Sequence, residues 1–261
     1  MYLPSAIKNF IGNKPYTLDE TGMSGSQILC FEDMVLKIEA QSEESDCEHK
    51  MTAWLADKLP VSKILCSMQE GGMNYLLMSR LEGEMACAET QLADSKRLVA
   101  LLAEGLRMLW RMDTADCPCR NSVDDKLKLA QYRVENGLCD MLDAEPETYG
   151  GGGFRDPAHL LQWLKENKPV EELVFSHGDY CLPNVFIKED KVSGFVDLGR
   201  SGVGDRYQDI ALCYRSLKHN YEGAYGGRVY PDFDADTLFD ELKIEPDCDK
   251  IRYYILLDEL F

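Results

Sequence analysis

Two stretches of the chain decide its fold: VFSHGDYCLPN at residues 174–184 and FVDLG at residues 195–199. Between them, short apolar runs predict a β-hairpin, with strands at residues 185–188 and 192–196 and a turn at Glu189-Asp190. The first stretch is then an apolar strand that ends in a polar loop. The second is a polar loop at the end of the hairpin.

Three polar side chains follow these strand ends in a fixed order, first Asp179, then Asn184 and then Asp197. Phosphoryl transfer from ATP requires a carboxylate that holds a hydroxyl, together with an amide and a second carboxylate that hold Mg²⁺. Kinases of the protein-kinase type use this order. We therefore expect Asp179 to be catalytic and Asn184 and Asp197 to bind Mg²⁺. A hairpin with ordinary polar loops would explain one such residue, but not three.

The amino-acid composition indicates which kinds of partner the protein can bind. The 261 residues include 28 Lys+Arg and 46 Asp+Glu, a formal net charge of −18. Such a field repels nucleic acid and anionic membranes, and no apolar run approaches the roughly 20 residues of a membrane span. We therefore expect neither nucleic acid nor membrane as a partner. Taken alone, the excess of acidic residues is explained by its effect on solubility. The sequence makes no prediction of the oligomeric state.

The cysteines and the amino terminus indicate the compartment. The ten cysteines are scattered, and the close pair Cys117 and Cys119 has no nearby histidine to complete a zinc site. The first residues lack the basic and apolar regions of a signal peptide. We expect a cytoplasmic protein with free thiols.

The hydrophobic pattern changes period near residue 80, which predicts an α+β fold of two lobes like that of a protein kinase. A small β-rich lobe (1–80), with two hairpins and one helix, binds the nucleotide, and a larger, mainly helical lobe (81–261) carries catalysis and substrate binding. The hinge is expected at about residues 79–83. The expected hairpins span residues 28–38 and 64–78, and the expected helices span 46–58, 94–112, 123–136, 157–166, 207–217 and 249–260.

The amino-terminal half supplies a cation for the phosphates. Lys37 lies near the end of an apolar strand, which delivers its ammonium group to the interior. Glu48, on the following helix, is the expected ion-pair partner, with Glu43, Glu44 and Asp46 as competitors.

Two further segments are candidates for nucleotide contacts. The small loop at residues 21–26 contains Ser24 and is suited to fold over phosphates, although it is equally consistent with a simple turn. Ser79 and Leu81 of the hinge would offer backbone groups to adenine. The chain contains no G-x-x-x-x-G-K-[ST] motif, which argues against a P-loop kinase.

The segment FSHGD at residues 175–179, Asn184, and GFVDLGRSG at residues 194–202 closely resemble the aminoglycoside phosphotransferases. The chain is most similar to the 3′-phosphotransferases, particularly the Gram-positive type III enzyme, up to the final YYILLDELF at residues 253–261. The resemblance implies a protein-kinase-like fold. It also implies transfer of the ATP γ-phosphate to an aminoglycoside hydroxyl, expected to be the 3′-hydroxyl, which confers antibiotic resistance.

The resemblance also implies roles for particular residues. Asp179 would be the catalytic base, and Asn184 and Asp197 would hold Mg²⁺. Lys37 would contact phosphates and pair with Glu48.

Further roles are implied by the same resemblance. Ser24 would contact the β-phosphate, and Arg200 would lie near the phosphates and the substrate. Asp209 would brace the catalytic loop. Glu259 and the carboxyl-terminal Phe261 would bind the aminoglycoside amines.

The chain departs from the type III pattern at two places. Val35 replaces a tyrosine that stacks on adenine, which leaves GTP open as an alternative to ATP. His219 and Asn220 replace two acidic substrate contacts, which leaves the range of aminoglycosides open.

The acidic composition suits such a substrate, because an aminoglycoside is a polycation at neutral pH. We expect contacts from the acidic loop, including Asp143 and Glu145, and from Asp258 and Glu259. The last two lie near a helix carboxyl end, where acidic groups are unfavourable for the helix dipole, which weakly favours a functional role.

Two alternatives stay open. One is a kinase for another small molecule, of the macrolide, choline or homoserine type. The other is a nucleotide-binding pseudokinase that acts as a partner-binding module, which the joint presence of Lys37, Asp179, Asn184 and Asp197 disfavours.

Overall fold

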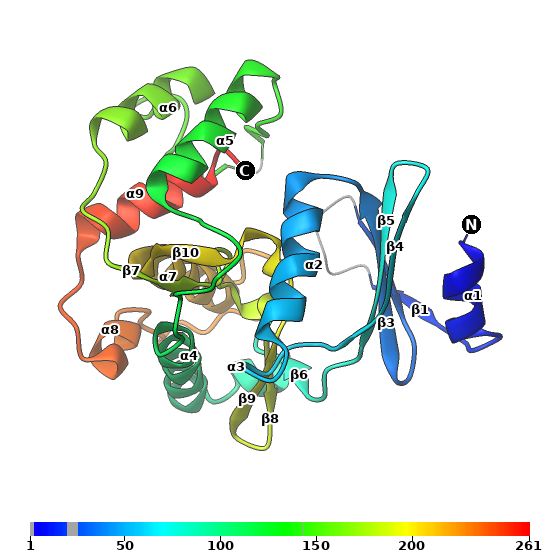
Figure 1. The fold of residues 1–261 in the computed structure, drawn as a ribbon. Helices are drawn as coiled ribbons and strands as arrows, with labels where there is room; N and C mark the ends of the chain where they lie inside the picture. The colour runs from blue at the N-terminus through cyan, green and yellow to red at the C-terminus, as the bar shows by residue number, and fades with distance from the viewer. Residues whose placement is uncertain (1–2, 20–25, 143) are drawn as a thin grey trace.

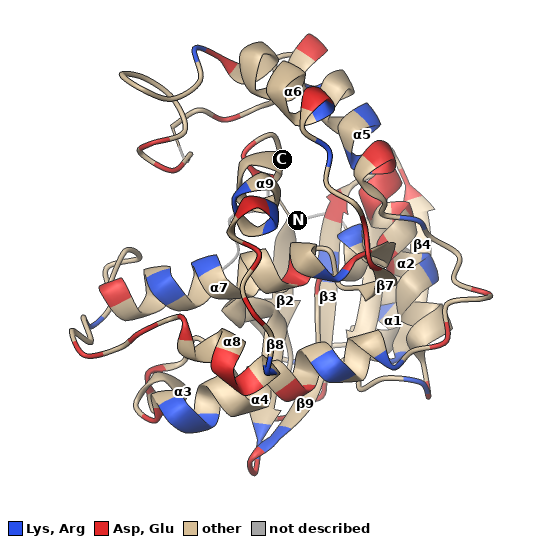
Figure 2. Cartoon of the chain, turned by 90° about the vertical axis from the view of Figure 1, so that its left-hand side faces the viewer, with Lys and Arg blue, Asp and Glu red and all other residues tan. Residues whose placement is uncertain are grey.

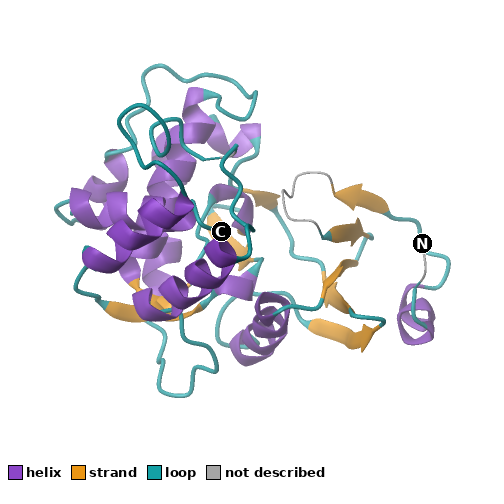
Figure 3. Ribbon diagram, turned by 90° about the horizontal axis from the view of Figure 1, so that it is seen from above, coloured by secondary structure: helices purple, strands orange, loops and turns teal. Residues whose placement is uncertain are grey.

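The computed structural model describes residues 3–19, 26–142 and 144–261 of the chain. A sheet-rich lobe and a larger helical lobe lie side by side, with helix α2 between them (Figure 1). The view from above shows the strands of the small lobe apart from most of the helices (Figure 3). The predicted α+β class is therefore confirmed, whereas the boundary at residues 79–83 stays a prediction.

The small lobe is built on an antiparallel five-stranded sheet with the strand order β1-β2-β3-β5-β4. Both hairpins predicted from the sequence are present. Helix α1, which the sequence did not predict, packs Ile7 into the apolar core of this lobe with Leu29, Leu36 and Leu77. The elements are α1 (Ser5–Ile11), β1 (Thr17–Asp19), β2 (Gln27–Cys30), β3 (Met34–Ala40), β4 (Ile64–Glu70) and β5 (Met73–Ser79).

Helix α2 (Glu43–Leu55) joins the two lobes. It begins three residues earlier than predicted, because the side chains of Ser42 and Ser45 reciprocally cap its first turn. Met51 and Leu55 are fully buried, and they belong to the apolar core of the large lobe. A helix of the small lobe is thus anchored in the large one.

The large lobe packs its helices around two small sheets, β10-β7 and β6-β8-β9. The predicted hairpin is present as β8 and β9. The helices are α3 (Glu89–Leu92), α4 (Ser95–Trp110), α5 (Val123–Glu135), α6 (Pro157–Glu166), α7 (Arg206–Glu222), α8 (Thr237–Leu242) and α9 (Cys248–Asp258). The strands and 3-10 turns are β6 (Glu84–Met85), β7 (Leu173–Ser176), η1 (Leu182–Asn184), β8 (Val185–Lys188), β9 (Lys191–Phe195), η2 (Leu198–Arg200) and β10 (Gly202–Asp205).

Local signals explain where the large-lobe helices begin and end. Asp94 caps α4 and Asp156 caps α6 through their side chains. Helix α7 continues five residues past its predicted end at Leu217, until Gly223 takes the left-handed conformation that closes it. Among the described residues, no helix is long and apolar enough to cross a membrane.

Gly105 on α4 allows Tyr180, the residue after Asp179, to approach the helix. A Cβ atom at Gly105 would lie 2.1 Å from the Tyr180 hydroxyl oxygen. Tyr180 is fully buried, and its hydroxyl donates a hydrogen bond to the Leu102 carbonyl (2.9 Å). The helix therefore seats the segment that carries Asp179.

We predict that Gly105→Ala destabilises the protein despite the better helix propensity of alanine. Overpacking costs about 1–3 kcal/mol, which exceeds the gain of about 1 kcal/mol in propensity. The free energy of unfolding in urea should fall by about 1–2 kcal/mol. Gly151→Ala is the control, because a Cβ atom there meets nothing within 4 Å. Equal stability of the two variants would contradict the prediction.

Candidate active site

A cavity of about 360 Å³ lies between the lobes. Lys37 and Glu48 of the small lobe face Asn184 and Asp197 of the large lobe across it. The remaining walls are mainly apolar and suit a flat aromatic ring. They include Ile28, Val35, Met78, Leu81 and Phe186.

The Lys37 ammonium group joins the two lobes in this cavity. It lies 2.7 Å from Glu48 Oε2, 3.0 Å from Asp197 Oδ1 and 3.6 Å from Glu39 Oε2. The structure therefore selects Glu48 from the four acidic candidates on this helix. Glu44 instead pairs with Arg200 (3.0 Å).

The charges in this cluster perturb one another. Burial works against the Lys37 ammonium group, but Glu48 and Asp197 outweigh it and raise its pKa. Burial raises the pKa of Glu48 to about 7. At Asp197, burial opposes the charged form, but the Lys37 ammonium group outweighs it and lowers the pKa. The salt bridges thus keep Asp197 ionised, as a metal ligand must be.

The backbone at Asp197 is unusual. Its φ of 58° and ψ of 61° place a residue with a side chain in the left-handed region. Such a conformation costs on the order of 1–3 kcal/mol and is found preferentially at functional sites. It turns the carboxylate towards Lys37 between the end of β9 and the start of η2.

The loop that carries Asp179 is fixed by one buried carboxylate. Asp209 accepts hydrogen bonds from the backbone N–H groups of His177 (2.8 Å) and Gly178 (2.9 Å) and from the Ser176 hydroxyl (3.1 Å). Asp209 is fully buried. This geometry is consistent with the bracing role that the resemblance implied for Asp209.

Asp179 itself contacts Asn184. The Asn184 Nδ2 group donates to both the backbone oxygen and Oδ2 of Asp179, each at 3.0 Å. This orientation turns the amide oxygen of Asn184 away from Asp179. Burial and the nearby Asp258 raise the pKa of Asp179. An amide oxygen and the Asp197 carboxylate are the hard oxygen ligands that Mg²⁺ prefers, so these residues fit that ion.

The acidic residues at the carboxyl end lie close to the loop that carries Asp179, but they are ion-paired. Asp258 pairs with both Arg200 (3.6 Å) and Arg215, and Glu259 pairs with Arg215 (3.6 Å). Burial opposes the charge of Asp258, but Arg215 and Arg200 outweigh it and lower its pKa. The sequence alone did not point to Arg215, because it lies on a helix outside any motif.

Glu145 and His219 form a second link in this region. The Glu145 backbone N–H donates to Glu259 Oε2 (3.2 Å), and Glu145 Oε1 lies 3.0 Å from His219 Nε2. The acidic loop is thereby tied to α7 and to the end of α9. His219, one of the departures noted above, occupies this corner of the site.

The carboxyl-terminal Phe261 is held by cations that the sequence did not reveal. Arg133 donates to the backbone oxygens of Leu260 (2.7 Å) and Phe261 (2.8 Å). The Lys126 ammonium group and the Arg200 guanidinium group lie 5.2 and 5.4 Å from the Phe261 ring centroid. Burial lowers the pKa of Lys126 to about 8.

The other residues that the sequence predicts as nucleotide or substrate contacts lie in different surroundings. Leu81 lines the cavity. The Ser79 backbone N–H donates to the Lys63 carbonyl (2.8 Å), and its hydroxyl accepts from the Lys63 N–H (2.8 Å). Ser24 and Asp143 lie outside the described residues. The side chains that the sequence placed in the reacting set, namely Lys37, Glu48, Asp179, Asn184 and Asp197, do converge.

A sheet-rich lobe that carries a Lys–Glu pair and a helical lobe that carries an ordered Asp, Asn and Asp define a kinase-like phosphotransferase. Comparison with known proteins agrees. Residues 21–246 match the model of the phosphotransferase enzyme family, and the chain belongs to this family.

The relatives narrow the group within the family. The chain is 40% identical to an aminoglycoside 3′-phosphotransferase of Niallia circulans, over 99% of this chain and 97% of that protein. It is 38% identical to one of Enterococcus faecalis, over 100% and 99%. The predicted membership of the aminoglycoside phosphotransferases is confirmed.

A solved structure supports the fold. Aminoglycoside phosphotransferase APH(3'')-Id from Streptomyces rimosus superposes with a TM-score of 0.81 at 22% identity, covering 97% of this chain and 95% of that chain. That protein has also been solved with ADP and streptomycin. The predicted two-lobed, kinase-like fold is confirmed.

We predict that Glu259 makes stability depend on pH. Its side chain is 4% exposed, and burial raises its pKa from an ordinary 4.5 to about 7. The folded state therefore holds this proton more tightly than the unfolded chain. The resulting stability is fully present below pH 4.5 and is lost as the pH rises through about 7.

Glu259→Gln removes this contribution while keeping an oxygen acceptor. The Tm of the variant, relative to the unmodified protein, should rise steadily between about pH 4.5 and 7.5 in calorimetry. The exposed Glu147→Gln is the matched control and should show a flat difference. A flat difference for Glu259→Gln as well would contradict the prediction.

Proposed function

We propose that this enzyme transfers the γ-phosphoryl group of ATP to the 3′-hydroxyl of aminoglycoside antibiotics and thereby confers resistance. The observation that carries the proposal is the convergence of Lys37, Asp179, Asn184 and Asp197 between the two lobes. The names of the relatives support the substrate class.

The nucleotide occupies the cavity between the lobes in this proposal. Adenine lies against Val35, Met78, Leu81 and Phe186, which contact its faces without selecting strongly between purines. GTP therefore remains an alternative donor. Lys37 contacts the phosphates, with Glu48 holding its ammonium group.

Asn184 and Asp197 would hold Mg²⁺, which would supply positive charge to neutralise the nucleotide phosphates. The described residues that face it act mainly by position, because a loose transition state leaves the protein little covalent chemistry. The left-handed backbone of Asp197 fixes one ligand in advance.

Asp179 orients the acceptor hydroxyl and takes up its proton as the oxygen–phosphorus bond forms. Its backbone is fixed through Asp209, and its side chain is fixed through Asn184. The raised pKa of Asp179 favours this proton uptake. The γ-phosphoryl group passes to the hydroxyl oxygen, and ADP leaves.

The aminoglycoside lies beyond Asp179, towards the carboxyl end of the chain. Glu145, Glu259 and Phe261 contact its ammonium groups, and Asp143 belongs to the same acidic loop as Glu145. Asp258 contributes through Arg200 and Arg215, which it holds near the reacting centre. We place the enzyme in the cytoplasm, where its nucleotide is available.

A coupled assay with ATP and Mg²⁺ tests the substrate class. We expect turnover with aminoglycosides that carry a 3′-hydroxyl and none with matched 3′-deoxy aminoglycosides, a macrolide, choline or homoserine. Phosphorylation of the 3′-deoxy compounds would contradict the position, and phosphorylation of a macrolide, choline or homoserine would contradict the substrate class. Intact nucleotide binding without any turnover would favour the pseudokinase alternative.

We predict that Asp179→Ala lowers kcat by about 100- to 10,000-fold, because a positioned general base contributes about that much. The Kd for ATP should stay within about twofold, because Lys37 and the cavity walls are retained. Turnover is measured by the coupled assay and ATP affinity by calorimetry. Asp232→Ala, at an exposed position, is the control. Near-normal turnover of Asp179→Ala would refute the catalytic role.

A further inference from the structure

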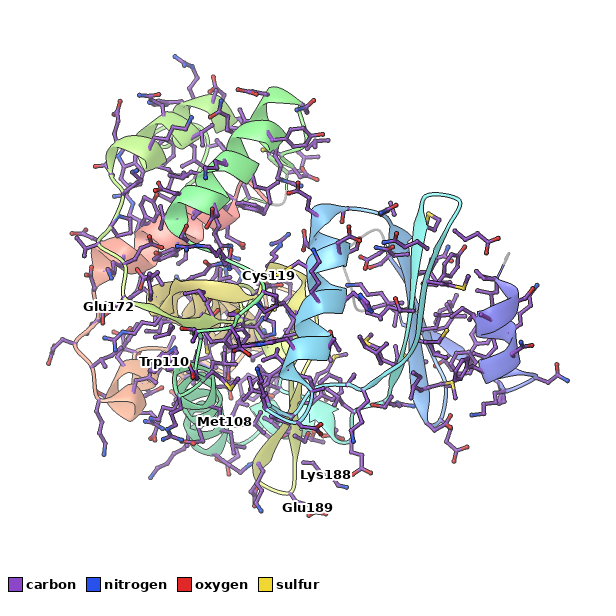
Figure 4. The ribbon with its side chains drawn as sticks, viewed as in Figure 1. Met108, Trp110, Cys119, Glu172, Lys188 and Glu189 are labelled. Atoms are coloured by element: carbon purple, nitrogen blue, oxygen red, sulfur yellow. The ribbon has the colours of Figure 1, made fainter. Side chains whose placement is uncertain are left out.

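Two cysteines from different lobes meet outside the active site. Cys47 lies on α2, and Cys119 lies 72 residues later on the segment between α4 and α5. Their Sγ atoms are 2.7 Å apart, longer than a disulfide bond but closer than two unbonded sulfur atoms usually approach. Figure 4 places the labelled Cys119 beside α2. All ten cysteines lie in the described residues, and none is in a disulfide bond.

The backbone around Cys119 is held in place independently of Cys47. The Cys119 carbonyl accepts the Val203 N–H of β10 (3.1 Å) and the Cys117 thiol (3.3 Å). A Cβ atom at Gly202 would lie 2.8 Å from this carbonyl oxygen, so β10 approaches closely. Cys119 is therefore a fixed point on the large lobe.

Cys47 is fixed on the small-lobe side of the same contact. Helix α2 holds it next to Glu48, and its thiol also lies 3.7 Å from the Ser201 carbonyl oxygen. Both cysteines are half-buried, so a small reagent can reach them. A sulfur–sulfur bond here would join the lobes without moving either backbone far.

The two thiols differ in reactivity. The hydrogen bond from Cys47 and the ammonium group of Lys50 lower the pKa of Cys119 to about 7, although burial opposes this shift. The hydrogen bond to Cys119 and burial raise the pKa of Cys47. The thiolate is the nucleophile in oxidation, so Cys119 reacts with the oxidant first. Cys47 then attacks the oxidised sulfur and completes the disulfide bond.

We propose that Cys47 and Cys119 are a redox modification site, at which a peroxide forms a disulfide bond that ties α2 to the large lobe. The Cys119 thiolate attacks a peroxide oxygen and breaks the O–O bond, giving a sulfenic acid and hydroxide. The sulfur of Cys47 then displaces the sulfenic oxygen as water. In sum, two thiols and one hydrogen peroxide give one disulfide and two waters.

The bond would act on the helix that organises the nucleotide site. Helix α2 carries Glu48, which holds Lys37, and Glu44, which holds Arg200. The sulfur contact coexists with both ion pairs, so oxidation preserves this arrangement while it ties the lobes together. A reducing cytoplasm reverses the bond, which makes the site responsive to oxidative stress.

The test treats the full-length protein with a small excess of hydrogen peroxide and maps the disulfides by mass spectrometry without reduction. We expect a mass loss of about 2 Da, a linked pair of peptides that contain Cys47 and Cys119, and reversal by dithiothreitol. The Tm should rise by about 5 °C or more on oxidation, because the bond constrains the unfolded chain.

Single serine variants distinguish a disulfide bond between Cys47 and Cys119 from oxidation of other cysteines. Cys47→Ser and Cys119→Ser should lose both the mass change and the Tm rise, whereas Cys117→Ser and the exposed Cys248→Ser should keep both. A link from Cys117 in place of Cys119, or no Cys47–Cys119 peptide in the unmodified protein, would overturn the proposal. The mapping needs no variant, so it decides the proposal even if a serine variant fails to fold.

Discussion

The Lys37 ammonium group is the interaction on which the arrangement of the site depends. An isolated buried cation is unfavourable by several kcal/mol, and removing one partner of a buried pair is strongly destabilising. Lys37 is 8% exposed and shared between Glu48 on α2 and Asp197 at the end of β9. These two elements belong to different lobes, so the Lys37 ammonium group forms an ion pair across the boundary between the lobes. The nucleotide cavity lies beside this ion pair.

Helix α2 connects the ion pairs of Lys37 to the core of the large lobe. Its side chains Met51 and Leu55 are buried in that lobe's core, and Glu44 pairs with Arg200. A Cβ atom at Gly199 would lie 2.7 Å from the Glu44 side chain, so the D-L-G turn and the helix are in close contact. The turn that carries Asp197 and the Lys37 partner Glu48 are therefore held in place by the same helix.

The sequence predicted the parts of the site that lie on continuous motifs. Asp179, Asn184 and Asp197 follow strand ends that short apolar runs reveal, and both lobes have recognisable periods. Other parts depend on contacts between distant segments. Glu48 was the expected partner of Lys37, but Glu43, Glu44 and Asp46 were close competitors in the sequence, and only the orientation of α2 decides between them. The glycine-rich β10 has no alternating pattern, and its pairing with β7 is decided in three dimensions.

The acidic carboxyl end shows why composition alone misjudges a charged site. A net charge of −18 and acidic positions over many elements (Figure 2) suggest carboxylates that are free to bind a cation. Asp258, however, is held by Arg200 and Arg215, and Arg133 holds the last two carbonyl groups. Because each arginine comes from a separate segment of the chain, no sequence motif predicts these contacts. Asp258 holds two guanidinium groups, and Glu145 and Glu259 are themselves paired with His219 and Arg215, so a polycationic substrate meets carboxylates that already have partners.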